Sequence, residues 1–199
     1  MVPVLSYLFL KGRCRSCGAK ISLQYPAIET LCGVLGVFCV IIYQPTFHAL
    51  LAFSLLAGLV AVAETDRKTM EIPNGLILYL LVPAAGLAAL PDQTGLLSHI
   101  IGAFCVSLPL LLLILLIPGS FGGGDVKLMA ACGLALGWQL TLVGFFLALI
   151  TGGAYGGWLL LTRRAGGKSH FAFGPFLALG TGLALLAGQS VLDWYLGFF

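Results

Sequence analysis

Two acidic stretches, each beside a long apolar run, are the parts of this chain best suited to chemistry. Asp66 lies just after one apolar run, and Asp125 follows three consecutive glycines and precedes Lys127 by two residues. An ionisable side chain at the edge of a membrane span often marks a functional site. Glycines permit unusual dihedral angles and close backbone approach, so a carboxylate on such a loop can face a water-filled cavity instead of lipid. The loop glycines are Gly122, Gly123 and Gly124.

Two carboxylates held a few ångströms apart can perform acid–base chemistry without a metal ion. Repulsion opposes the ionisation of both, so the pair shares one proton. The ionised member can deprotonate a water molecule, while the protonated member polarises a peptide carbonyl and later protonates the leaving amine. This is the chemistry of an aspartic protease, and it makes Asp66 and Asp125 a candidate catalytic pair.

Simpler interpretations stay open for the acids near Asp66. Its carboxylate at the membrane interface can pair with Arg67 or Lys68. Glu64 is a rival acid that lies closer to the apolar run, and Glu71 precedes an Ile-Pro pair, where it can cap a helix or face solvent.

The remaining charged candidates also have alternatives. Asp125 can cap the helix that follows a flexible glycine loop. Lys127 suits a cytoplasmic anchor, or a residue that tunes Asp125. Glu29, at the start of the first apolar run, can stabilise a helix dipole or meet a basic substrate.

Composition places the chain in a membrane. Its 199 residues are 60% hydrophobic and 9% charged, with a mean hydropathy of +1.07, whereas soluble domains carry roughly 25% charged residues. The sequence predicts an all-α polytopic membrane helix bundle of about seven transmembrane helices, with a kink at Pro109. The expected spans are 27–43, 47–63, 76–90, 96–117, 126–138, 139–161 and 171–192.

The basic residues predict an orientation. If the N-terminus is cytoplasmic, the cytoplasmic segments are 1–26, 64–75, 118–127 and 162–170. They contain four, two, one and three Lys or Arg residues, which together are all ten in the chain. The positive-inside rule is therefore obeyed, and Asp66 and Asp125 are both expected at the cytoplasmic face.

Cys14 and Cys17 form a C-x-x-C in the basic segment 1–26. Because disulfides are rare in the cytoplasm, half of a zinc site is the sharper interpretation, although the pair supplies two of the four ligands that zinc takes. The other four cysteines lie in apolar runs, where Cys behaves as a small hydrophobe.

Four blocks of sequence resemble the type IV prepilin peptidases, a family of membrane aspartyl proteases. The glycine loop with Asp125 resembles their G-x-G-D motif, and Asp66 followed by Ile-Pro-Asn at 72–74 resembles their first catalytic aspartate and its downstream motif. The segment from Arg13 to Glu29 resembles their cytoplasmic cysteine region, and Phe-Gly-Pro-Phe at 173–176 resembles their last block. The blocks occur in the family's order and cover nearly the whole chain.

The resemblance implies an enzyme of the bacterial inner membrane that cleaves basic leaders from prepilins, or from pseudopilins of type II secretion, at the cytoplasmic face. Asp66 and Asp125 would be catalytic, and Glu29 and Glu71 are possible leader contacts. Many members also methylate the new N-terminus with S-adenosylmethionine. The expected partners are these substrates and membrane lipids, with no nucleic acid. The expected organisation is a basic N-terminal segment, 1–26, and a transmembrane peptidase domain, 27–199.

The chain resembles a short form, because longer members carry an additional N-terminal span and a second C-x-x-C. This departure bears on zinc binding and methylation but leaves the aspartate pair untouched. One alternative is a truncated, non-catalytic paralogue that serves as a membrane assembly component. Another is a small transporter with the two aspartates as proton carriers, although transport sites usually lie near the membrane midplane.

Overall fold

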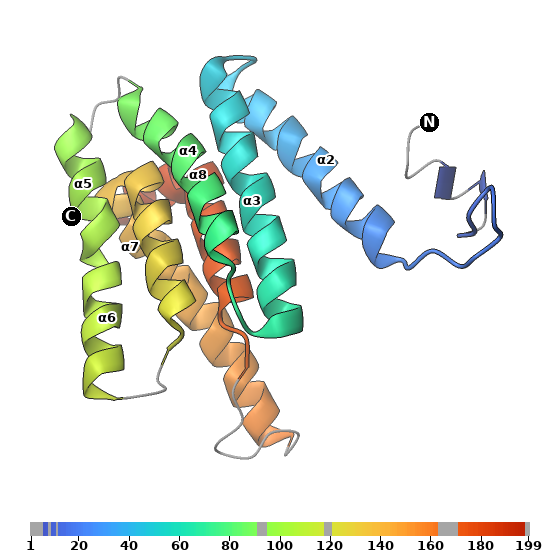
Figure 1. Cartoon of the computed structure of the whole chain (residues 1–199). Coiled ribbons are helices and arrows are strands. Elements are labelled where there is room, and N and C mark those ends of the chain that lie inside the picture. Colours follow the sequence, from blue (N-terminus) through green and yellow to red (C-terminus); the bar gives the residue numbers. More distant parts are fainter. Residues whose placement is uncertain are drawn as a thin grey trace.

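Helices form the body of the molecule, and the N-terminal end of α2 diverges from the others (Figure 1). The structure, a computed structural model, describes residues 6–7, 9–10, 12–90, 95–117, 121–162 and 171–197. Within these ranges extended pairing is limited to one isolated bridge, between Arg13 and Lys20. The prediction of an all-α bundle is therefore confirmed. The helices are α2 (Gln24–Tyr43), α3 (Phe47–Thr69), α4 (Asn74–Ala89), α5 (Gly95–Cys105), α6 (Ser107–Leu116), α7 (Gly123–Leu161) and α8 (Gly174–Leu196).

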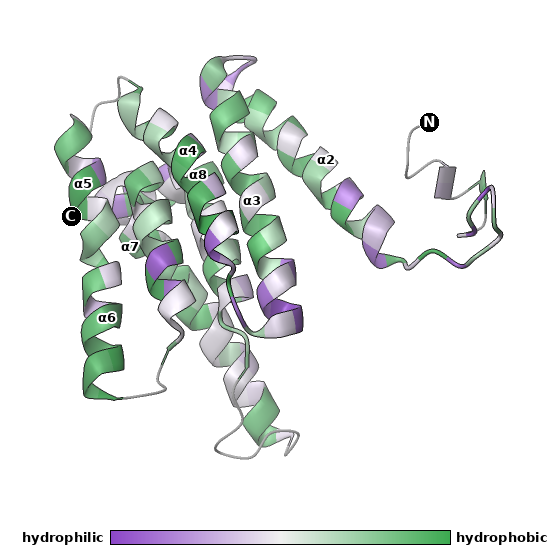
Figure 2. Ribbon diagram, in the orientation of Figure 1, coloured by the Kyte–Doolittle hydropathy of each residue, from purple (hydrophilic) through white to green (hydrophobic). Residues whose placement is uncertain are grey.

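The outer faces of the helices are suited to lipid. Five helical stretches in the described part are long and apolar enough to cross a membrane: α2, α3, α5 with α6, α7 and α8. The apolar α4 has 16 residues and is about 24 Å long at 1.5 Å per residue. Large apolar side chains such as Leu78, Val82 and Leu115 are exposed, and Figure 2 shows apolar residues over the outer helix faces. The chain is a multi-pass membrane protein, and the count of seven spans stays a prediction.

Two helix ends differ from the predicted spans in ways that affect the site. α2 begins at Gln24 instead of residue 27, so Glu29 lies beyond the first turn, which contains no acidic residue. α3 continues past residue 63 to Thr69, because Glu, Arg and Lys are good helix formers even where the apolar run has ended. Asp66 therefore belongs to the last turns of a helix, and not to a loop.

The predicted kink at Pro109 is a break one turn earlier. α5 ends at Cys105 and α6 begins at Ser107. A proline has no N–H to donate, and its ring clashes with the carbonyl four residues before it, which here is that of Cys105. The distortion therefore falls on the N-terminal side of the proline.

The chain reverses direction within α7. Gly137 has a φ of +74°, a conformation open to glycine, and it separates two helical parts. A straight helix would hold Lys127 and Leu149 about 33 Å apart at 1.5 Å per residue, yet both line one cavity. Figure 1 shows the yellow first part and the orange second part of α7 on either side of this reversal. The predicted boundary between the spans 126–138 and 139–161 corresponds to this kink.

Glycines let α8 pack directly on the second part of α7. A Cβ at Gly180 would overlap the carbonyl oxygen of Gly144 and lie 2.8 Å from the amide nitrogen of Ala148. Small residues permit such backbone-to-backbone contact in a membrane, where packing replaces the hydrophobic effect. This contact sets the position of α8, whose first residue reaches the site described below.

Candidate active site

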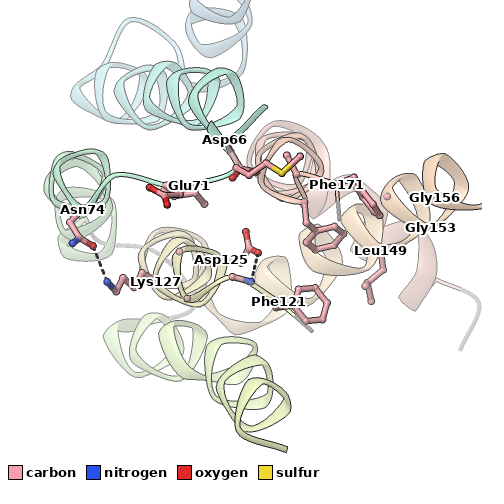
Figure 3. Close-up of a pocket in the computed structure, with 18 of the residues that line it drawn as sticks. Asp66, Glu71, Asn74, Phe121, Asp125, Lys127, Leu149, Gly153, Gly156 and Phe171 are labelled. Atoms are coloured by element: carbon pink, nitrogen blue, oxygen red, sulfur yellow. Dashed lines mark hydrogen bonds between the residues drawn. The ribbon is translucent and has the colours of Figure 1, made fainter. Parts of the chain in front are cut away.

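One open cavity of about 1010 Å³ brings together residues from α3, both parts of α7 and the segments that precede α4 and α8. Figure 3 shows the carboxyl groups of Asp66 and Asp125 directed into it from two different helices. Its polar side also contains Glu71, Asn74 and Lys127. The other lining residues are Met70, Ile72, Phe121, Gly122, Gly123, Gly124, Leu149, Gly152, Gly153, Gly156, Gly157, Phe171, Ala172 and Phe173.

Two backbone amides hold Asp66, one through its side chain and one through its carbonyl oxygen. The side chain is 5% exposed, and its Oδ2 accepts a hydrogen bond of 2.9 Å from the backbone N–H of Gly174. Its carbonyl accepts the N–H of Met70, a residue in the left-handed conformation that ends α3. The carboxyl group is therefore fixed at the point where α3 stops.

Asp125 lies in the first turn of α7 and is 7% exposed. Its Oδ2 accepts a hydrogen bond of 3.2 Å from the backbone N–H of Gly122. The expectation that Asp125 caps its own helix is thus confirmed, and the cap coexists with a place in the cavity wall. A helix N-terminus favours a carboxylate at this position.

The Ile-Pro-Asn segment holds the glycine loop in place. A Cβ at Gly124 would lie 2.9 Å from the Cβ of Ile72, so glycine is needed for this contact. Lys127 donates a hydrogen bond of 2.8 Å from Nζ to Oδ1 of Asn74, across 53 positions of sequence. Lys127 therefore joins the start of α7 to the start of α4.

Replacing Lys127 with Met should break this bridge at small cost, because both side chains are exposed. We expect a loss of at most about 1 kcal/mol in the free energy of unfolding. Asn74→Ala should lower the free energy of unfolding by a similar amount, and the double variant should lower it no further than either single variant. Unfolding of the four proteins in detergent measures the coupling. Fully additive losses would show that the bridge does not form in solution.

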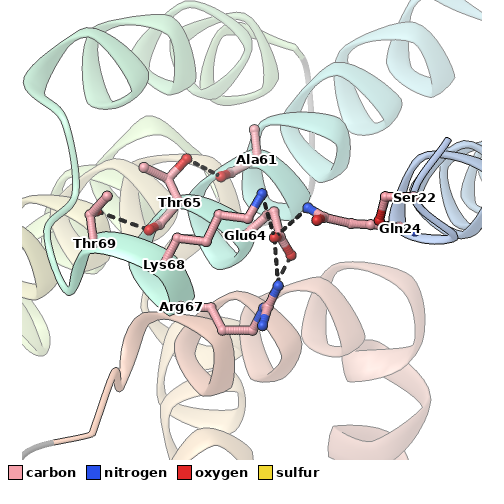
Figure 4. Close-up of polar contacts among 8 residues, drawn as sticks. All are labelled: Ser22, Gln24, Ala61, Glu64, Thr65, Arg67, Lys68 and Thr69. Carbon is pink, nitrogen blue, oxygen red and sulfur yellow. Dashed lines mark hydrogen bonds and ion pairs between the residues drawn. The ribbon is translucent and has the colours of Figure 1, made fainter. Parts of the chain in front are cut away.

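Glu64, the rival acid, belongs to a different surface (Figure 4). Its carboxylate pairs with Arg67 at 2.7 Å and with Lys68 at 3.0 Å, and it accepts a hydrogen bond from Nε2 of Gln24 on α2. Residues three and four apart share a helix face, whereas Asp66, two positions from Glu64, points away from that face. The proposed pairing of Asp66 with Arg67 or Lys68 is therefore wrong, because both cations pair with Glu64.

The opposite side of the cavity is apolar. The rings of Phe121 and Phe173 meet edge to face, with centroids 5.4 Å apart. Gly152 underlies Phe173, since a Cβ there would approach the ring to 2.7 Å. Gly153 and Gly157 line the cavity with nothing within 4 Å of their Cβ positions, so this wall is formed by helix backbone.

Of the two predicted leader contacts, one lines the cavity and the other does not. Glu71 is exposed and lines the polar side of the cavity. Glu29, on α2, is partly buried and is not among the described residues that line the cavity. The basic loop predicted at 162–170 lies outside the described residues except for Thr162.

Cys14 and Cys17 lie on a tight turn closed by hydrogen bonds from Cys14 to Ala19 and from Gly18 to Cys14. The amide of Cys17, and then that of Ser16, lower the pKa of the Cys14 thiol from its usual range. Such a turn suits a thiolate, which is the form that binds metal. No cluster of three or more potential metal ligands occurs in the part of the chain that the structure describes. A tetrahedral zinc site takes four ligands and these thiols account for two, so zinc binding at this turn stays a prediction.

Sequence reasoning missed two polar partners of the site. Asn74 belongs to the Ile-Pro-Asn motif and Gly174 to the Phe-Gly-Pro-Phe motif, but neither motif indicates the bond of Asn74 to Lys127 or that of Gly174 to Asp66. The Phe-Gly-Pro-Phe motif was the available signal for the second partner. Its contact spans 108 positions of sequence, which no local pattern can predict.

The fold and the cavity define a multi-pass membrane protein with two buried carboxyl groups facing one space. A model of the type IV leader peptidase family matches residues 51–157, more than half of the chain. A model of the bacterial peptidase A24 N-terminal domain matches residues 1–43. The chain belongs to the type IV leader peptidase family, and it is a protease.

Curated relatives carry the name prepilin leader peptidase/N-methyltransferase. The protein from Bacillus subtilis (strain 168) is 33% identical over 196 residues, which cover 98% of this chain and 79% of the relative. The protein from Aeromonas salmonicida (strain A449) is 38% identical over 200 residues, covering 98% of this chain and 69% of the relative. The protein from Burkholderia pseudomallei (strain K96243) is 38% identical over 196 residues, which cover 94% of this chain and 62% of the relative. The chain has no significant match among solved structures.

Proposed function

We propose that this protease hydrolyses the peptide bond between a basic leader and the apolar segment that follows it in prepilins or type II secretion pseudopilins. Asp66 and Asp125 are its catalytic pair, which makes it an aspartic endopeptidase. The observation that carries the proposal is that these two carboxyl groups, from different helices and each less than 10% exposed, line one cavity. Two carboxyl groups that share a site and a proton are the arrangement that aspartic proteases use for peptide hydrolysis.

The reaction follows from one proton shared by the pair. The ionised carboxylate takes a proton from a water molecule, and the water oxygen attacks the scissile carbonyl carbon. The other carboxyl donates its proton to the carbonyl oxygen. Collapse of the tetrahedral intermediate breaks the C–N bond. The amine leaves with a proton from the first carboxyl, and the second carboxylate takes a proton back from a hydroxyl of the intermediate, which restores the pair. In each aspartate Oδ2 bonds to a backbone amide, so Oδ1 is the oxygen placed for this exchange.

The two sides of the cavity match the two parts of such a substrate. Glu71 can attract the basic leader on the polar side, and the aromatic side with the bare helix backbone can receive the apolar segment. Glu29, away from the cavity, would meet a more distant part of the leader. Residues 1–26 would form the basic segment on the cytoplasmic side, ahead of the transmembrane peptidase domain at 27–199.

We place the cavity at the cytoplasmic face of the bacterial inner membrane, with the N-terminus in the cytoplasm. The positive-inside distribution of all ten basic residues supports this orientation. Lys127 lines the cavity, and Arg67 and Lys68 are exposed in the last turn of α3, the helix that carries Asp66. A basic leader held at the cytoplasmic surface would then reach Asp66 and Asp125 without crossing the membrane.

Purified full-length chain in detergent, mixed with a model prepilin, tests the proposal by mass spectrometry of the products. Cleavage between the leader and the apolar segment is the expected result. The same reaction with S-adenosylmethionine tests the second activity in the relatives' names, because methylation adds one methyl mass to the mature product. A folded chain that cleaves none of several prepilins and pseudopilins would favour the alternative, a non-catalytic membrane assembly component.

Glu64→Gln should leave cleavage within about twofold of wild type, although it removes the acid nearest to Asp66 along the chain. Glu64 is committed to Arg67, Lys68 and Gln24 and lies outside the cavity lining. The loss of exposed ion pairs should lower the free energy of unfolding by about 1 kcal/mol or less. Cleavage rates and melting of the two proteins measure both effects. A loss of activity comparable to that of an Asp66 variant would reassign the catalytic acid.

A further inference from the structure

The backbone amide at the start of α8 is directed at a side chain of another helix. Phe173 precedes α8 and gives it no side-chain cap. The N–H of Gly174 instead donates to Oδ2 of Asp66 on α3, at 2.9 Å and in a buried position. The first free donor of α8 is thus satisfied by a residue from a different part of the bundle.

In the first turn of α8, the amide of Gly174 is the one available to bond with Asp66. Pro175 has no N–H, and the amides of Phe176 and Leu177 both donate to the carbonyl of Phe173. The helix end therefore presents Gly174 to Asp66. The positive end of the helix also favours the negative charge of the carboxylate at this place.

The contact needs glycine at position 174. A Cβ there would lie 2.6 Å from Oδ2 of Asp66, 2.9 Å from its Cγ and 3.1 Å from its Cβ. These atoms belong to a short side chain whose backbone is fixed at the end of α3, so they cannot move aside without turning the carboxyl group. Any larger residue would displace the carboxyl group from its amide.

We infer that Gly174 is a positioning residue, which holds Asp66 through its backbone amide so that the second carboxyl oxygen faces the cavity and Asp125. The inference rests on the proposed function and adds α8 to the catalytic apparatus. Asp125 receives the equivalent support from Gly122 within its own helix. Asp66 depends for its support on the docking of α8, and hence on the packing of α8 against α7.

The kinetic test compares Gly174→Ala with Gly182→Ala, a matched change in the same helix. A Cβ at Gly182 meets Leu56 at 3.3 Å and lies outside the cavity lining. With purified full-length protein and a model prepilin, Gly174→Ala should lower kcat about 100-fold with little change in KM, because a small displacement of a catalytic group acts on the chemical step. Gly182→Ala should cleave within about twofold of wild type. Equal cleavage by the two variants would overturn the inference.

A spectroscopic test detects the hydrogen bond between Gly174 and Asp66 in the absence of substrate. The chain has two Phe-Gly pairs, Phe121-Gly122 and Phe173-Gly174, so protein labelled with ¹³C-carbonyl Phe and ¹⁵N-Gly gives two selected amide signals. These are the two amides that donate to Asp125 and Asp66. Asp66→Asn should shift the Gly174 signal and leave that of Gly122 in place, and Asp125→Asn should do the reverse.

The two tests separate this inference from the proposed function. If wild-type protein cleaves prepilins but Asp66→Asn leaves the Gly174 signal unmoved, the inference is wrong and the peptidase assignment stands. If no prepilin is cleaved, the proposed function fails, and a Gly174 signal that moves with Asp66 still establishes the contact. If Gly174→Ala does not fold, the spectra of the two Asp→Asn proteins decide.

Discussion

Asp125→Asn and Asp66→Asn should each abolish leader cleavage, with a loss on the order of 10⁴-fold or more in kcat. An amide can neither take a proton from water nor deliver one to the leaving amine, so each replacement removes a step that the other carboxyl cannot supply. Since the two groups act as a unit, the double variant should be no slower than the slower single variant.

Neither replacement should unfold the protein. Asparagine keeps the shape of aspartate, and its side-chain oxygen can still accept the N–H of Gly122 or Gly174. Removal of a buried charge also relieves a desolvation penalty, so melting in detergent should be unchanged or raised. Asp193→Asn, an exposed change near the end of α8, is the matched control and should cleave normally. Normal cleavage by both single active-site variants would exclude this pair from the mechanism.

Gly180→Ala should produce the largest loss of stability among single methyl additions in α8. The added Cβ would overlap the Gly144 carbonyl oxygen and crowd the Ala148 amide, both of which are backbone atoms that no rotamer change can move. The helices α7 and α8 must separate to admit it. We expect a loss of about 3 kcal/mol or more in the free energy of unfolding, at the upper end of the range for overpacking.

Thermal melting of purified protein in detergent, read together with the yield of monodisperse protein, measures this effect. Gly33→Ala on α2 is the control, because a Cβ there meets nothing within 4 Å. It should be neutral or slightly stabilising, since alanine favours helix more than glycine does. Because Asp66 takes its hydrogen bond from α8, Gly180→Ala should also lower cleavage by any protein that remains folded. An unchanged melting temperature would show that α7 and α8 do not approach at these glycines.

The stretch around Asp66 shows what sequence could and could not predict. The sequence pattern identified three acids, Glu64, Asp66 and Glu71, but the predicted helix ended at residue 63. Without the helix that continues to Thr69, the 100° step between residues could not be used to separate Glu64 from Asp66. The structure assigns Glu64 to a surface ion-pair cluster, Asp66 to the cavity and Glu71 to its rim.

The hairpin within α7 is a second example. The short predicted helix 126–138 and its successor at 139–161 indicated a boundary, and the kink at Gly137 lies close to it. The sequence contained no indication that this kink returns Gly153 and Gly156 to the cavity that contains Asp125 (Figure 3). Folding back depends on contacts between α7, α5 and α8, in which each backbone fits the glycines of another helix.

The sequence by itself determined the membrane class, the positions of most helices, the two carboxyl groups and the resemblance to a family, because these depend on composition, on the length of apolar runs and on short motifs. Only the tertiary structure decided that Asp66 and Asp125 share a cavity, that Lys127 binds Asn74 and that α8 holds Asp66 through Gly174. The physical reason is the range of the interactions. Hydropathy and helix propensity act within a few residues, whereas the site is built from contacts between segments 53 and 108 positions apart.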